Sequence, residues 1–169
     1  SAQVERDRLR LETHLKLALD IGGAGSWEYS YDTDRHTLSE GVLRILGCPA
    51  EAAPRSLQDW VERVHPDDRA LLGAALEREQ KAETPAQRLE YRIRHADGHW
   101  IWIEDHRCVT ERKADGSPRI RAGVMNDITA RQEDRRQDDR QTRALRLMNG
   151  IAPALVRHPD EPSMLPEVC

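Results

Sequence analysis

The chain has 169 residues, with 26 basic and 30 acidic side chains and a formal net charge of -4 at pH 7. This length allows one domain of ordinary size with appendages, but not two full domains. The charges are mixed and form no basic stripe, so no nucleic acid is expected as a partner. No apolar run approaches the roughly 20 residues that span a bilayer, and the charged start excludes a signal peptide.

Three cysteines are widely spaced and form no CxxC pair. This usage favours free thiols in a reducing compartment, so we expect a cytoplasmic location without membrane contact. Ser1 and Ala2 resemble an expression scar, and the chain stops at Cys169 within an amphipathic pattern. We therefore expect a piece of a larger protein.

The first predicted element is a helix over residues 4–21, which ends at Gly22 and Gly23. Its apolar residues follow a helical period: Val4, Leu11, Leu15, Ala18 and Leu19. A hairpin follows. Residues 26–31 alternate Trp27, Tyr29 and Tyr31 on one face, turn formers occupy 32–34, and a short second strand covers 36–39.

The middle of the chain is predicted to be helical. A short helical segment, EGVLRILG, precedes a loop rich in Pro and Ala, and Ser56 and Pro66 are typical helix starters. The pair His65-Pro66 divides a short helix from a longer one.

The stretch 89–129 is the most informative part of the sequence. It predicts the hairpin LEYRIRHADGHWIWIEDHRCV, the turn KADGSP, and a last strand, RIRAGVMNDIT, that leads into a charged helix. Trp100 and Trp102 share one strand face, with Ile101 and Ile103 on the other. Both faces of the sheet are therefore apolar, and the face away from the core needs a cover, either the N-terminal helix or a partner chain.

This order of elements predicts the fold class α+β. Short turns within the strand pairs require antiparallel pairing, because parallel neighbours need long crossovers. The helical segment is then the single crossover, and the helices cover one face of the sheet.

Several motifs in this order resemble the PAS sensor family, in the subgroup that ends in the tripeptide DIT. They are GSWEYSYDTD, LSEGVLRILG, WVERVHPDDRA and EYRIRHADGHWIWIED. The resemblance implies an N-terminal linker helix over 1–22, a PAS domain over 23–129 and a C-terminal signalling helix with the start of a truncated following domain over 130–169. It also implies a five-stranded antiparallel sheet of order 2-1-5-4-3, with helices on one face over a small cavity.

The tail from Ala144 onward is similar to the opening helix of GAF domains that follow PAS domains in bacterial signalling proteins. Such proteins often carry diguanylate cyclase or phosphodiesterase modules, which act on cyclic di-GMP. The implied output domain, a kinase, a cyclase or a phosphodiesterase, is not in this chain. The chain itself carries no phosphate loop, nucleophile elbow or HExxH motif, so it is not expected to be an enzyme.

The resemblance also implies roles for individual residues. Asp127, Ile128 and Thr129 stand where a strand becomes a helix, so they are expected to cap the helix and to relay the signal into it. The hypothetical ligand-cavity residues, taken from strand alternation and family resemblance, are Trp27, Tyr91, Trp102 and Asn126.

No cofactor is predicted. The helix before the third strand contains no His, Cys or Met, which disfavours haem, and Cys48 does not match the flavin-binding photosensor motif. No metal site is predicted either. His95, His99, His106 and Cys108 gather in the hairpin, but His95 and His99 flank a turn where polar residues are expected on solvent grounds. An unknown small ligand and a packed core without a ligand both stay open.

The expected function is therefore a sensory PAS module that binds a small ligand or mediates dimerisation. It would relay a signal through the C-terminal helix to the output domain of the same chain, and a homodimer is expected. The alternative is a ligand-free dimerisation module whose terminal helices pair, because apolar residues resume close to a heptad at Leu145, Met148, Ala152 and Leu155.

Overall fold

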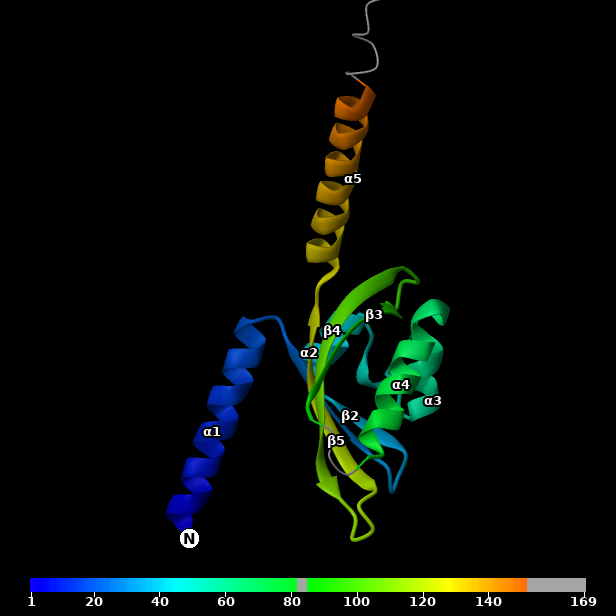
Figure 1. Cartoon of the computed structure of the whole chain (residues 1–169). Helices are drawn as coiled ribbons and strands as arrows, with labels where there is room; N and C mark the ends of the chain where they lie inside the picture. The colour runs from blue at the N-terminus through cyan, green and yellow to red at the C-terminus, as the bar shows by residue number, and fades with distance from the viewer. Residues whose placement is uncertain (82–84, 152–169) are drawn as a thin grey trace, which may run out of the picture. The chain divides into compact units, whose positions relative to one another are not determined.

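The computed structural model describes residues 1–81 and 85–151, in two compact units. The first unit, residues 1–130, contains the sheet and most of the helices (Figure 1). Its elements, in chain order, are α1 (Ala2–Ile21), β1 (Gly25–Ser30), β2 (Arg35–Leu38), α2 (Glu40–Leu46), η1 (Ala50–Ala52), α3 (Leu57–Arg63), η2 (Pro66–Asp68), α4 (Arg69–Glu79), β3 (Gln87–Arg94), β4 (Trp100–Arg112) and β5 (Pro118–Asp127). A last helix, α5 (Thr129–Ile151), leads into the second unit.

The strands form one five-stranded sheet of order β2-β1-β5-β4-β3, in which every neighbouring pair is antiparallel. Tight turns join β3 to β4 and β4 to β5, with Gly98 and Gly116 at φ values of 101° and 85°. The segment from α2 to α4 is the single crossover between the two edge strands, β2 and β3. The predicted fold class, strand order and antiparallel pairing are confirmed.

The helices of the crossover begin at residues suited to that task. In α3 the side chain of Ser56 accepts from the amide of Asp59, and the Asp59 carboxylate accepts from the amide of Ser56, which makes a capping box. Nδ1 of His65 accepts from the amide of Asp67 at 3.2 Å and so caps η2. The predicted division at His65-Pro66 is therefore confirmed.

The core lies between the sheet and the crossover helices; α3 and α4 pass over one face of the sheet (Figure 1). Strand alternation holds as predicted, since Ile101 and Ile103 are buried while Trp100 is 37% exposed and Trp102 is half-buried. The core cluster takes residues from every strand except β2, from α2, α3 and α4, and from the connecting segments: Trp27, Tyr29, Val42, Ile45, Leu46, Cys48, Trp60, Val64, Leu72, Ala75, Leu89, Tyr91, Ile93, Ile101, Ile103 and Met125.

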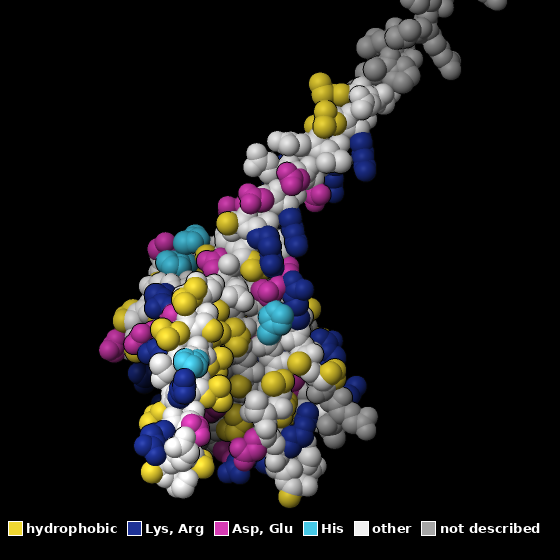
Figure 2. Space-filling view, turned by 90° about the vertical axis from the view of Figure 1, so that its left-hand side faces the viewer, with side chains coloured by type: hydrophobic (Ala, Val, Ile, Leu, Met, Phe, Trp, Pro, Cys, Tyr) yellow, Lys and Arg dark blue, Asp and Glu magenta, His cyan; other side chains and the backbone are white. Residues whose placement is uncertain are grey.

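The N-terminal helix α1 buries none of its residues. Within the predicted apolar stripe, only Leu19 is half-buried. An ion pair of 3.2 Å between Asp20 and Arg44 connects the helix to α2. Hydrophobic side chains gather on the side of the molecule that carries α1 (Figure 2). Within the first unit, α1 therefore presents its apolar residues to solvent: Val4, Leu9, Leu11, Leu15, Leu17 and Ile21.

The second unit begins at Arg131 and consists of α5 over its described residues. Its side chains are almost all exposed, including Leu145, Leu147 and Met148. Most of the segment that resembles a GAF helix lies outside the described residues. Over the described ranges, none of the helices has both the length and the apolar character that a bilayer crossing requires.

Candidate functional site

Among the residues that the structure describes, four charged side chains lie on the core side of the sheet. Protein interiors rarely accept charges unless they are paired. Glu79 from α4, Asp105 and Arg107 from β4, and Arg121 from β5 are between 1% and 3% exposed. They meet between the sheet and α4, so we call them the buried charge cluster. Two guanidinium groups here face two carboxyl groups.

Glu79 is the anchor of the cluster. Its Oε1 accepts from Nε of Arg107 at 2.7 Å, and its Oε2 accepts from Nη2 of Arg107 and from Nη1 of Arg121, both at 3.2 Å. One carboxylate thus holds two guanidinium groups, and Arg107 is held in the bidentate geometry that gives strong charge-assisted bonds.

Asp105 has different partners. Its carboxyl group accepts from the indole N–H of Trp27 at 2.9 Å and from the hydroxyl of Tyr91 at 3.4 Å, and the nearest guanidinium nitrogen of Arg107 is 3.7 Å away. Trp60 extends this network by donating its indole N–H to the Tyr91 hydroxyl at 3.2 Å. Trp27 and Tyr91 thus donate to Asp105 directly, and Trp60 donates to Tyr91.

An aromatic wall surrounds the guanidinium of Arg121. It lies 4.5 Å from the ring centre of Tyr29, 5.6 Å from that of Trp27 and 5.5 Å from that of Tyr31, which are cation-π distances. Gly123 makes room for this arrangement, because a Cβ there would lie 2.7 Å from the indole of Trp27. The position of the indole ring therefore depends on a glycine in the facing strand.

Burial changes the acid-base behaviour of the groups in this region. Burial raises the pKa of Asp105 above its usual range, although Arg107 and the donors from Trp27 and Tyr91 act in the opposite direction. Burial, with the charge of Arg121, lowers the pKa of His36 to about 4. The His36 imidazole is therefore neutral at pH 7, and so is the Tyr91 phenol, whose pKa burial raises.

A small cavity of about 10 Å³ lies at the centre of the cluster, with Trp27, His36, Trp60, Asp105, Arg107 and Arg121 as its walls. This volume is room for about one water molecule. Nε of Arg121 is buried and has no hydrogen-bond partner. A buried, unpaired N–H on a charged group is rare in native proteins, and here it belongs to a side chain that lines the cavity.

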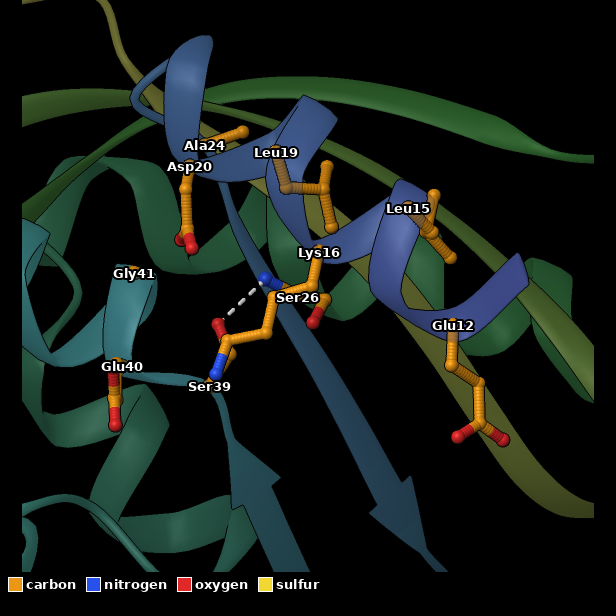
Figure 3. A pocket seen from close by; sticks show the side chains of 10 residues that line it. All are labelled: Glu12, Leu15, Lys16, Leu19, Asp20, Ala24, Ser26, Ser39, Glu40 and Gly41. Atoms are coloured by element: carbon orange, nitrogen blue, oxygen red, sulfur yellow. Dashed lines mark hydrogen bonds between the residues drawn. The ribbon is translucent and has the colours of Figure 1, made fainter. Parts of the chain in front are cut away.

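A larger hollow of about 320 Å³ lies outside the core, between α1 and the start of α2. Leu15 and Leu19 line it from α1, and the opposite wall carries the hydrogen bond of 2.9 Å from the Ser26 amide to the Ser39 hydroxyl (Figure 3). Its charged residues have both signs and come from different elements. It is an open groove, not an extension of the core.

The tripeptide Asp127 to Thr129 is fastened to β4 at one residue. The amide of Ile128 donates to the carbonyl of Trp102 at 2.8 Å, and the Trp102 amide donates to the hydroxyl of Thr129 at 2.9 Å. The Asp127 carboxylate accepts from the amide and hydroxyl of Thr129 at 2.9 and 2.6 Å. The end of the sheet and the first residue of α5 are thus joined through the backbone of β4.

The four hypothetical cavity residues do not lie together. Trp27 and Tyr91 both bind Asp105 in the buried charge cluster. Trp102 and Asn126 lie on the other face of the sheet, because they alternate with the buried Ile103 and Met125.

Sequence reasoning missed the four charged residues themselves, because charged side chains in a strand are normally read as exposed. For two of them, strand alternation in the sequence did indicate burial. Asp105 and Arg107 continue the alternation of Ile101 and Ile103, so the pattern already placed them on the core face. Nothing local indicated Glu79, which lies 28 residues before its main partner.

A family model described as the PAS fold matches residues 35–125, which is more than half of the chain. A sensory box histidine kinase/response regulator from Burkholderia thailandensis E264 is 28% identical with a TM-score of 0.68, over 78% of this chain and 97% of that one. The N-terminal domain of a diguanylate cyclase with a PAS/PAC sensor from Marinobacter aquaeolei is 26% identical with a TM-score of 0.56, over 64% and 98%. No curated protein matches the chain.

The chain therefore belongs to the PAS fold family, as the sequence predicted. Its structural relatives come from a sensory box histidine kinase/response regulator and from a diguanylate cyclase with a PAS/PAC sensor, which supports a signal-transduction sensor module. The family match ends before Asp127, so the subgroup defined by the DIT tripeptide stays a prediction, as does the GAF-like helix.

Proposed function

We propose that this PAS module senses a small anion or carboxylate through the buried charge cluster. It relays the change through Asp127, Ile128 and Thr129 into α5, and from there to the output domain of the same chain. The output domain is a kinase, a diguanylate cyclase or a phosphodiesterase, and the first two of these classes occur among the structural relatives. The module works in the cytoplasm of a bacterium, as part of a homodimer.

The observation that supports this proposal most strongly is Nε of Arg121, a buried donor without a partner on a side chain that lines a polar cavity. The cluster holds two guanidinium groups, and its second carboxyl group, Asp105, has a raised pKa. Any protonation of Asp105 leaves an excess of positive charge, which favours an anionic ligand. A ligand larger than water must open the cluster, and this opening supplies the conformational signal.

A short path runs from the cluster to the proposed relay. Asp105 pairs with Met125 in the register of β4 and β5, and Ile103 pairs with Asp127 two residues further on. A shift of β4 at Asp105 therefore reaches Trp102, whose amide and carbonyl hold Thr129 and Ile128. Replacing Asp127 with Ala in the full-length protein tests the relay, because an unchanged response to the ligand would argue against it.

Native mass spectrometry of the purified chain, with thermal shifts in chloride, nitrate, formate and acetate, tests the ligand. We expect at least one anion to raise the melting temperature of the wild-type chain but not that of Arg121→Lys, which keeps the charge and loses the Nε–H donor. Arg119→Lys is the matched control, since Arg119 lies on the same strand and is exposed. If mass spectrometry finds no bound molecule and the melting temperatures of all three proteins shift equally, a packed core without a ligand is the better explanation.

A second candidate function is a dimerisation module whose terminal helices pair. The supporting observation is the set of exposed large apolar residues on α1, a helix that buries none of its residues. Sedimentation of Leu11→Glu/Leu15→Glu in the whole chain tests it, with Lys16→Glu as control. A dimer lost only in the double variant assigns pairing to α1. A dimer kept there, and also in a fragment of residues 23–129, assigns it to the sheet face.

A further inference from the structure

The turn between β3 and β4 brings together three side chains that can bind a metal ion. Its sequence is His95-Ala96-Asp97-Gly98-His99, and it is closed by a hydrogen bond of 2.9 Å from the His95 amide to the His99 carbonyl. Gly98 adopts the positive φ of 101° that the turn requires. The tight turn brings the side chains of residues 95, 97 and 99 close together.

The three candidate ligand atoms, one from each of His95, Asp97 and His99, all lie within 4.8 Å of one another. Nδ1 of His95 is 3.0 Å from Oδ1 of Asp97, and Nδ1 of His99 contacts the same oxygen. Ligand atoms around one tetrahedral zinc ion are about 3.4 Å apart, given metal–ligand distances of about 2.1 Å. Small side-chain rotations therefore suffice to place the three atoms around an ion.

The more buried imidazole of the set is held in place by packing. His95 lies against Gly47 at the end of α2, where a Cβ would be 2.1 Å from Nε2 of His95, and the amide of Ala96 donates to the carbonyl of Leu46 at 2.9 Å. With Nε2 against α2, Nδ1 faces Asp97. One ligand is thus oriented before any ion arrives, which lowers the entropy cost of binding.

The donor set selects the kind of ion. Two imidazole nitrogens and one carboxylate oxygen suit Zn²⁺ and similar transition metals, whereas Mg²⁺ and Ca²⁺ prefer oxygen ligands throughout.

We propose that His95, Asp97 and His99 form a binding site for a divalent transition-metal ion, with Zn²⁺ as its representative, at the tip of the β3–β4 hairpin. The site is independent of the buried charge cluster. A bound ion fastens the hairpin tip and, through His95 and Ala96, its contact with the end of α2. The ion would complete its coordination shell with solvent, because the turn is open on the side of His99.

Isothermal titration of ZnCl₂ into the tag-free chain, stripped with a chelator beforehand, tests the site. We expect one ion per chain and a higher melting temperature with Zn²⁺. In His99→Ala and Asp97→Ala the affinity should fall at least about tenfold. His99 and Asp97 have side chains 56% and 60% exposed, so both variants should fold, and circular dichroism checks this.

Three control variants remove other candidate ligands: His14→Ala, His106→Ala and Cys108→Ser. Each should bind Zn²⁺ as the wild-type chain does. Two results would overturn the proposal: no saturable binding to the wild-type chain at millimolar Zn²⁺, or binding that survives in His99→Ala and Asp97→Ala. Titration with NiCl₂ and CuCl₂ then ranks the ions, and MgCl₂ should give no heat of binding.

Discussion

Removal of the Glu79 side chain should destabilise the domain more than most single substitutions. In Glu79→Ala the guanidinium of Arg107 loses contacts of 2.7 and 3.2 Å, and that of Arg121 loses one of 3.2 Å. Both arginines stay at most 3% exposed, so water cannot replace the carboxylate without opening the core. The variant therefore leaves two charges buried with too few partners.

The expected loss is about 3–5 kcal/mol of unfolding free energy, the cost of removing one partner of a buried ion pair. The two guanidinium groups share one carboxylate, so their contributions do not add, and Asp105, 3.7 Å from Arg107, offsets part of the loss. A domain of this kind has about 5–15 kcal/mol in total. The variant should therefore retain a cooperative transition at a much lower urea midpoint.

Urea unfolding followed by tryptophan fluorescence measures this loss, since Trp27 lies in the cluster. Glu77→Ala is the matched control: it removes an exposed carboxylate from the same helix and should change stability by no more than about 0.5 kcal/mol. A Glu79→Ala variant within about 1 kcal/mol of wild type would refute the reasoning. The triple variant Glu79→Leu/Arg107→Met/Arg121→Leu should recover most of the loss, because apolar replacement of buried ion pairs is often neutral or stabilising, and Asp105, whose pKa burial raises, keeps its donors Trp27 and Tyr91.

Three further predictions concern other parts of the domain. The pKa of His36 is lowered from 6.5 to about 4, so the neutral imidazole contributes fully to stability above pH 6.5 and this contribution is lost as the pH falls towards 4. Urea unfolding should therefore give a free energy about 2 kcal/mol lower at pH 5 than at pH 7.5, and His36→Phe should lack this difference. Gly41→Ala should lower the free energy of unfolding by roughly 1–3 kcal/mol, because its Cβ would lie 2.4 Å from the Ala24 carbonyl. Gly73→Ala, which has open space around it, should raise it by about 0.5–1 kcal/mol, and a loss of equal size in both variants would contradict the packing argument. Thr129→Val should cost about 1–3 kcal/mol by leaving the Trp102 amide without its acceptor and should alter output in the full-length protein, while Thr129→Ser should behave as wild type in both assays.

The fold could be predicted because its signals are local. Gly98 and Gly116 mark two tight turns, alternation marks β4, and Ser56 and Pro66 mark helix starts. Each of these features fixes a few neighbouring residues, and antiparallel order follows from the short connections. The same kind of evidence predicted a cap at the start of the last helix, where the Asp127 carboxylate accepts from the Thr129 amide two residues further on.

The interior of the site could not be predicted in the same way, because its partners are distant in sequence. Glu79 meets Arg121 across 42 residues, and Trp27 meets Asp105 across 78. No local pattern indicates that a helix carboxylate will be paired with strand guanidinium groups. For the same reason the local sequence predicts only a polar, solvent-exposed turn at His95, Asp97 and His99, whereas the packing of His95 against Gly47 involves another element.

In the proposed relay, the attachment of Ile128 and Thr129 at the end of the sheet also sets a threshold for signalling. Two hydrogen bonds to Trp102 of about 1 kcal/mol each, net of water, and about 1.5–3 kcal/mol from the buried side chain of Ile128 hold the detached state below about 1 percent at rest. An input of about 3 kcal/mol, at the top of the usual range of coupling energies, raises the detached population about 150-fold without making it the majority. On this proposal the junction stays closed without a stimulus, and a single small ligand opens it only in a fraction of the molecules.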